Sequence, residues 1–175
     1  MTLNVIVLAL VTLSRSIELP FARANTRRLL AAGGHEVAPG HYPLIVALHA
    51  AWLVALWWLA RDRPVSLPLL GMFALVEVLR IWVLLTLGKR WTTRIIVVPG
   101  EALVRRGPYK FLNHPNYAVV VAEITLLPLV FGLWRTALIF SLLNAAALTI
   151  RIRAENRALS ASSPRSAERP GHLAN

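Results

Sequence analysis

Five apolar stretches separated by polar segments set the pattern of this chain. They cover residues 2–13, 42–60, 65–87, 117–134 and 136–150. The three central stretches reach or approach the roughly 20 residues that an α-helix needs to cross a bilayer. The pattern therefore predicts an all-α integral membrane protein with about five transmembrane helices.

The first stretch is short for a full span and has two interpretations. It could extend to Leu19 if Arg15 and Glu18, spaced i,i+3, pair with each other near the interface. Alternatively, it could be a signal peptide cleaved at residues 22–24. The first residues lack the usual Lys or Arg, and Arg15 and Glu18 interrupt the approach to that site, so we favour a span.

Composition agrees with the membrane class. The chain is 57% hydrophobic and 15% charged, with mean hydropathy +0.59, whereas soluble domains are about 45–50% apolar and about 25% charged. The net charge is nevertheless +11. A soluble nucleic-acid-binding protein would explain the charge but not the apolar excess, so no nucleic-acid partner is expected. Because cysteine is absent, a disulfide framework, a zinc-thiolate site and a cysteine nucleophile are excluded, and no metal site is expected.

The distribution of cations predicts the orientation. If the N-terminus lies outside, the only outside cations are Arg61, Arg63 and Arg135, and nearly all the others lie inside, as the positive-inside rule requires. The basic residues are mostly arginine and alanine is abundant, which is typical of a GC-rich, bacterial genome. We therefore expect a multi-pass protein of the bacterial inner membrane with its active site facing the cytosol.

Several ionisable residues fall within the apolar stretches, where each needs a partner or a task. Glu77 and Arg80 are spaced i,i+3 and are expected to form a mutual ion pair. Glu123 has no partner nearby in its own stretch; it could be protonated, meet an arginine of another helix, or line a cavity. His49 is expected to be a helix-packing hydrogen-bonding residue rather than a ligand.

The inside loop at residues 107–117 contains one glycine, two prolines, two tyrosines and a histidine. Pro108 and Pro115 disfavour helix at the residues that precede them, so a helix should begin just after Pro115. Its free amides suit a carboxylate, and His114 stands beside them. Two tyrosines of this loop could close over a flat ring. The alternative is an aromatic, proline-rich loop that only anchors the helix at the interface.

The fifth stretch ends in a charged segment, with Arg151, Arg153 and Glu155 at alternate positions. Arg151 and Glu155 are spaced i,i+4 and share one helix face. The simple interpretation is a positive-inside stop with an incidental ion pair. Because this segment and the 107–117 loop fall on the same side of the membrane, they could instead form one interfacial site.

These motifs resemble the isoprenylcysteine carboxyl methyltransferase family. The motifs are Gly107-Pro108-Tyr109, His114-Pro115-Asn116-Tyr117, and Arg151-x-Arg153-x-Glu155 after two apolar stretches. The resemblance covers residues 91–159. Upstream, a looser similarity to a bacterial branch involves Glu18, Arg23, Asn25, residues 41–43 and His49. The chain departs from the family pattern at Asn113, where many members have arginine, and at Asn156, where the bacterial branch commonly has a second glutamate.

The resemblance implies a membrane enzyme that uses S-adenosylmethionine. The residues implied in cofactor binding are Tyr109, His114, Pro115, Tyr117 and Glu155. The proposed catalytic residues are Arg151 and Arg153, either of which could hold an anionic acceptor, and Glu155, which could bind the amine or ribose of the cofactor. The Gly-rich loop of soluble methyltransferases is absent, and this family does not use that fold.

The resemblance also implies a lipophilic acceptor that enters from the bilayer. It could be a prenylated cysteine or a long-chain polyketide pyrone or resorcinol, methylated on a carboxylate or hydroxyl oxygen. A phospholipid N-methyltransferase and a sterol-type reductase remain alternatives, as does a transporter that uses Glu77, Arg80 and Glu123 as a polar path. We expect one domain over residues 1–159 and a disordered basic tail over residues 160–175.

Overall fold

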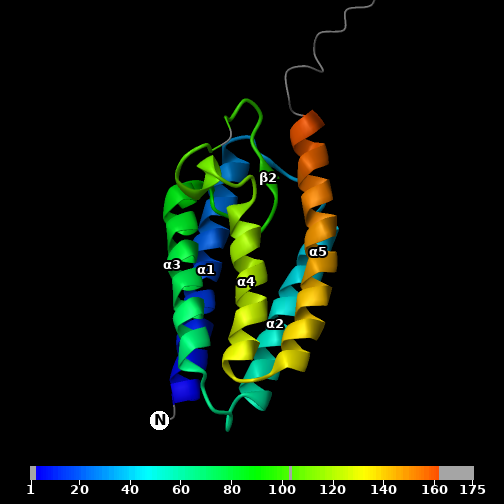
Figure 1. Ribbon diagram of the computed structural model, residues 1–175. Helices are drawn as coiled ribbons and strands as arrows, with labels where there is room; N and C mark the ends of the chain where they lie inside the picture. Colours follow the sequence, from blue (N-terminus) through cyan, green and yellow to red (C-terminus); the bar gives the residue numbers. More distant parts are fainter. Residues whose placement is uncertain (1–2, 103, 162–175) are drawn as a thin grey trace, which may run out of the picture.

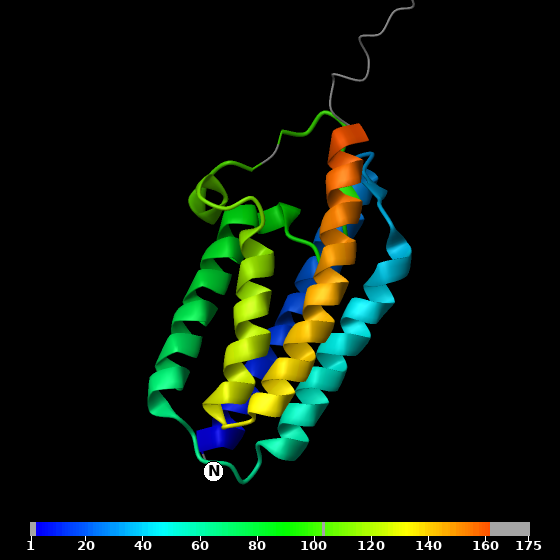
Figure 2. The same cartoon turned by 45° about the vertical axis from the view of Figure 1, so that its right-hand side comes forward.

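The structure is a computed structural model that describes residues 3–102 and 104–161; the side chains of residues 41 and 154–161 are not described. Within this part, five α-helices run side by side (Figures 1 and 2). They are α1 (Leu3–Ala31), α2 (Tyr42–Leu59), α3 (Leu67–Leu87), α4 (Pro115–Val130) and α5 (Trp134–Ala161). The expected tail lies outside the described residues, apart from positions 160 and 161, which end α5.

Short elements gather at one end of the bundle, at the top of Figure 1. They are the 3-10 helices η1 (Pro39–His41), η2 (Gly88–Arg90) and η3 (Gly107–Lys110) and the strands β1 (His35–Glu36) and β2 (Ile96–Val97). The strands pair antiparallel, with His35 opposite Val97 and Glu36 opposite Ile96. This end therefore contains most of the irregular backbone, and the opposite end has only short connections.

The helices have the length and surface of membrane spans. In the described part, α1, α2, α3 and α5 are long and apolar enough to cross a bilayer, and the 16-residue α4 is a shorter apolar helix. Large apolar side chains point outward, including Trp58, which is 85% exposed, and Leu85, which is 74% exposed. A soluble protein rarely exposes so much contiguous apolar surface, so this is an all-α membrane protein, as the sequence predicts.

Helix α1 is longer than the apolar pattern alone suggested. It runs through residues 22–24, and Ala22 is buried in the bundle. Near its end, the buried Asn25 amide donates hydrogen bonds to the backbone oxygens of Gly88 (3.0 Å) and Trp91 (2.8 Å). These contacts tie the polar end of α1 to the irregular end of the bundle, which supports a full helix rather than a cleaved signal peptide.

A network of five charged side chains crosses the middle of the bundle. Arg15 pairs with Glu18 (3.1 Å), as expected, and also with Glu77 (3.0 Å) and Glu123 (3.0 Å). Arg80 pairs with Glu123 (3.0 Å) and, through its Nε and Nη2 atoms, with Glu18. The network joins α1, α3 and α4.

The expected mutual pair of Glu77 and Arg80 is therefore wrong: in the described part, each is paired with other helices instead. The physical reason is that α1 and α4 each bring a buried carboxylate to Arg80, and leaving such a charge unpaired would be strongly destabilising. Glu123 takes the second of its three predicted alternatives, an arginine from another helix. His49 donates from Nδ1 to the Ile45 oxygen of its own helix (2.8 Å), which agrees with the hydrogen-bonding interpretation.

Three layers follow one another along the bundle. The apolar core, which includes Leu8, Leu56, Leu127 and Phe131, lies toward the end with the short connections. The charged network occupies the middle of α1, α3 and α4. The loops, strands and 3-10 helices lie at the remaining end, which contains the sequence motifs.

Candidate functional site

The first part of the site is the start of α4. Pro115 is buried in the first turn of this helix, and His114 precedes it as the N-cap residue with φ −132°. Proline suits this position because its missing N–H would have no partner in the helix anyway. The rings of His114 and Tyr117 stack with centroids 5.2 Å apart and an interplanar angle of 13°. The His-Pro-Asn-Tyr motif thus forms a rigid aromatic corner at the helix start.

The Gly-Pro-Tyr motif forms η3, which lies against the end of α3. Gly107 has φ +56°, and a Cβ atom there would lie 2.5 Å from the Thr86 hydroxyl oxygen. The position therefore requires glycine for both its left-handed backbone and its close approach. Pro108 is buried beside it, and Tyr109 follows half-buried. Contact with α3 thus fixes where Tyr109 stands.

Arg151 of α5 connects the two motif-bearing regions. Its side chain is buried, and its Nε donates to the Tyr117 hydroxyl (2.9 Å). Its Nη1 donates to the backbone oxygen of Thr93 (2.8 Å), and its guanidinium lies 5.5 Å from the centre of the Tyr117 ring. One arginine therefore fixes the C-terminal half of α5 to the start of α4 and to the loop that precedes β2.

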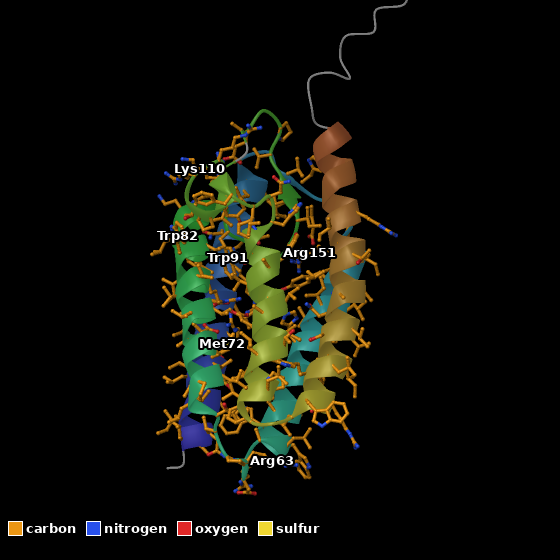
Figure 3. The ribbon with its side chains drawn as sticks, in the orientation of Figure 1. Arg63, Met72, Trp82, Trp91, Lys110 and Arg151 are labelled. Atoms are coloured by element: carbon orange, nitrogen blue, oxygen red, sulfur yellow. The ribbon has the colours of Figure 1, made fainter. Side chains whose placement is uncertain are left out.

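These residues line one cavity of about 1120 Å³ at the irregular end of the bundle. Tyr109, His114, Tyr117 and Arg151 all contribute to its wall, together with Asn113 and Asn116. Figure 3 shows Arg151 and Trp91 on either side of the upper part of α4. Ligand sites are commonly about 300–1,000 Å³, so the space is large enough for a nucleoside-sized cofactor with room for part of a second molecule.

The other residues singled out from the sequence lie elsewhere. Pro115 is buried at the start of α4 and does not belong to the described lining. Arg153 is exposed on α5 and does not belong to it either. Glu155 lies on α5, but its side chain is outside the described part, so its predicted role stays a prediction.

The loop between α3 and η3 contributes lining residues that the sequence analysis did not single out. Trp91 is 3% exposed and lines the cavity, and within the described part its indole N–H has no hydrogen-bond acceptor. Thr93 acts through its backbone oxygen, which no side-chain pattern could indicate. Trp91 could have been singled out from the sequence. It follows directly after the basic end of a membrane span, and an aromatic residue at that place is typical of an interfacial site.

Arg94 is the second lining residue that the sequence analysis missed. Its guanidinium pairs with Glu36 of β1 (2.7 Å) and lies 4.4 Å from the centre of the Tyr42 ring. The hydrogen bond that Arg94 donates to the Glu36 carboxylate raises the pKa of Arg94 above its ordinary value. Arg94 is therefore a fixed positive charge that joins the small sheet to the start of α2.

The cavity wall is rich in positive charge. Its described cations are Arg90, Arg94, Arg105, Lys110 and Arg151, and its described acid is Glu101. Glu101 pairs with Arg90 (2.5 Å). Because a low-dielectric wall focuses the field of such charges, this surface favours an anionic group in a bound molecule.

The described residues fit a nucleoside-containing cofactor. Tyr109, Tyr117 and His114 offer flat surfaces for a purine ring, and all three line the cavity. The positive wall beside them includes the buried Arg151. The combination of aromatic rings with a charged wall therefore suits a flat heterocycle that carries polar groups.

The fold and this cavity define a multi-pass membrane protein with a ligand site at one end of its bundle. A sequence profile of the isoprenylcysteine carboxyl methyltransferase family matches residues 69–161. The chain is also 40% identical over 159 residues to an uncharacterized protein, YpbQ, of Bacillus subtilis (strain 168), covering 88% of this chain and 95% of that protein. No solved structure matches. The chain belongs to the isoprenylcysteine carboxyl methyltransferase family, as its motifs predict, and this is a family of membrane methyltransferases.

Proposed function

We propose that the protein transfers a methyl group from S-adenosylmethionine to an oxygen atom of a lipophilic acceptor. The observation that carries this proposal is that Tyr109, His114, Tyr117 and Arg151, from η3, α4 and α5, line one cavity. A loop that only anchored α4 at the membrane interface would not need to enclose a cavity. A transporter that used Glu77, Arg80 and Glu123 would need these groups free to bind a solute, yet each is held in ion pairs between helices.

The protein's part in this reaction is orientation and electrostatics. The bound cofactor supplies an electrophilic methyl group on a sulfonium. The stacked His114 and Tyr117 rings would hold the purine end of the cofactor. Arg151, which Tyr117 and Thr93 fix in place, would hold an anionic acceptor. Correct alignment alone can contribute about 7–11 kcal/mol to lowering the barrier. A carboxylate acceptor is already ionised and needs no general base.

The chemistry of the cavity wall supports an oxygen acceptor over an amine. Two of the five described cations of the wall, Arg90 and Arg94, pair with acids, so the wall keeps a net positive charge. This charge stabilises a carboxylate or an acidic hydroxyl and repels a protonated amine. This favours O-methylation over phospholipid N-methylation. A prenylated cysteine and a long-chain pyrone or resorcinol both combine such an oxygen with an apolar chain, which would lie in the bilayer.

Calorimetry on the protein in detergent tests the cofactor assignment. We expect S-adenosylmethionine to bind, a nicotinamide cofactor not to bind, and His114→Ala to weaken binding by about tenfold or more, because stacking and hydrogen bonding are lost together. His35→Ala is the matched control, since His35 is exposed on β1. Binding of the nicotinamide cofactor alone would support the reductase alternative, and unchanged binding and turnover in His114→Ala would overturn the site.

Transfer of radiolabel tests the reaction itself. The protein is incubated with S-adenosylmethionine labelled on the methyl group and with a lipid extract, and the lipid-soluble products are separated. Label in an alkali-sensitive product indicates a methyl ester, and label in a stable product indicates an ether. Absence of label from every lipid-soluble product, despite cofactor binding, would contradict a lipophilic acceptor.

A further inference from the structure

A second, basic groove lies beside the cavity and is not explained by methyl transfer. It has a volume of about 690 Å³ and lies between η2 and the chain that leads into η3. Its cations are Lys89, Arg90, Arg105 and Arg106. Arg90 and Arg105 also line the cavity, so the two spaces are neighbours.

The groove lies at the level where a lipid headgroup would be. The apolar span that contains α3 ends at Arg90, and α3 is capped by Gly88 with φ +51°. The chain therefore leaves the apolar layer at the residues that form the groove. Membrane-spanning segments commonly have basic residues at this boundary, where they meet the headgroups.

Most of the positive charge in the groove is unbalanced. Arg90 pairs with Glu101 (2.5 Å), but Lys89, Arg105 and Arg106 have no acidic partner among the described residues. Arg106 donates from Nη2 to the backbone oxygen of Thr86 (3.4 Å), which holds it near the end of α3. Three such cations in the lining of one hollow favour a ligand with at least one phosphate-like negative charge.

The apolar surface below the groove indicates that this ligand has acyl chains. Trp82 is 45% exposed and Leu85 is 74% exposed on the outer side of α3. Figure 3 shows Trp82 on this outer side, with Lys110 above it. A tryptophan at the edge of an apolar face is typical of the membrane interface. We propose that the groove binds the headgroup of an anionic phospholipid from the surrounding bilayer, whose acyl chains lie along α3.

Lipid retention measured by native mass spectrometry tests this proposal. The full-length protein is reconstituted with phosphatidylcholine and a minority of phosphatidylglycerol and then released into mild detergent. We expect phosphatidylglycerol to be retained selectively, and its preference over phosphatidylcholine to fall by about a hundredfold in Lys89→Gln/Arg105→Gln/Arg106→Gln, from roughly 1 kcal/mol per cation. The matched control is Arg61→Gln/Arg63→Gln/Arg135→Gln, which removes three cations from the opposite end.

The helical circular dichroism signal of each variant is measured in parallel. A loss of bound lipid can therefore be distinguished from a loss of folded structure. If the triple variant does not fold, the single variants Lys89→Gln and Arg105→Gln replace it, with an expected several-fold loss each. The proposal would be overturned if the groove variant retained as much phosphatidylglycerol as the wild-type protein. It would also be overturned if the control variant lost as much of this lipid as the groove variant. If inorganic phosphate displaced phosphatidylglycerol at an equal concentration, the groove would be a site for free anions. That result would also overturn the proposal.

Discussion

At the residue scale, Arg151 is the side chain on which the site most depends. It is buried, charged and bonded both to the Tyr117 hydroxyl and to the Thr93 oxygen. A neutral residue of similar length would lose a charged hydrogen bond, which contributes about 1.5–3 kcal/mol. It would also leave the Thr93 oxygen without this partner, so both the shape and the charge of the cavity would change.

We therefore expect Arg151→Gln to lower kcat/KM for methyl transfer by about tenfold to a hundredfold. Tyr117→Phe removes one hydrogen bond but keeps the guanidinium, so its effect should be smaller. Arg135→Gln is the same substitution at the opposite end of the same helix and should leave kcat/KM unchanged. A larger loss in Tyr117→Phe than in Arg151→Gln would show that the hydroxyl, rather than the positive charge, is what the reaction uses.

At the element scale, the charged network determines how α1, α3 and α4 fit together. Arg80 contacts both Glu18 and Glu123, and its side chain is 9% exposed. Among the ion pairs of the described part, Glu77 takes part in the one with Arg15, and its side chain is 25% exposed. Breaking a buried pair by removing one partner typically costs about 3–5 kcal/mol because it leaves a buried charge behind.

Arg80→Met should therefore lower the free energy of unfolding by about 3–5 kcal/mol, measured by denaturing detergent in mixed micelles. Glu77→Gln should cost clearly less, since a glutamine can still accept a hydrogen bond from Arg15 and no buried charge is stranded. If the two variants were equally unstable, the network would depend on all five charges together rather than on the arginine bridges.

The helices themselves could be predicted from the sequence more readily than the contacts between them. The apolar stretch at 65–87 differs from α3 by only two residues at its start, because apolar length determines a span. The partner of Arg80 could not be predicted, because it depends on how three helices pack. Tyr109, His114, Tyr117 and Arg151 could be grouped because they fall on one side of the membrane. Thr93 could not be included, because it contributes a backbone oxygen whose position depends on the Asn25 contacts that hold this loop.

At the scale of the whole molecule, the two ends of the bundle differ in charge and in content. The cavity, the basic groove and the three sequence motifs lie at one end (Figure 1). At the other end, Arg61 and Arg63 lie between α2 and α3, and Arg135 lies in the first turn of α5; Figure 3 shows Arg63 there. The positive-inside rule predicts that the cavity end faces the cytosol and that the connection between α2 and α3 faces outward. This orientation would also give a water-soluble cofactor direct access to the cavity.

The chain contains no cysteine, so single cysteines can report this orientation. Asp62→Cys, between α2 and α3, should react with a membrane-impermeant maleimide in intact cells. Lys110→Cys, in η3, should react only after the cells are permeabilised; both positions are exposed, so accessibility within the fold does not bias the comparison. The reverse labelling would place the cavity outside and separate it from cytosolic S-adenosylmethionine. The positive-inside rule would then no longer explain the cations at the cavity end. Ligand binding would be the remaining reason for their positive charge.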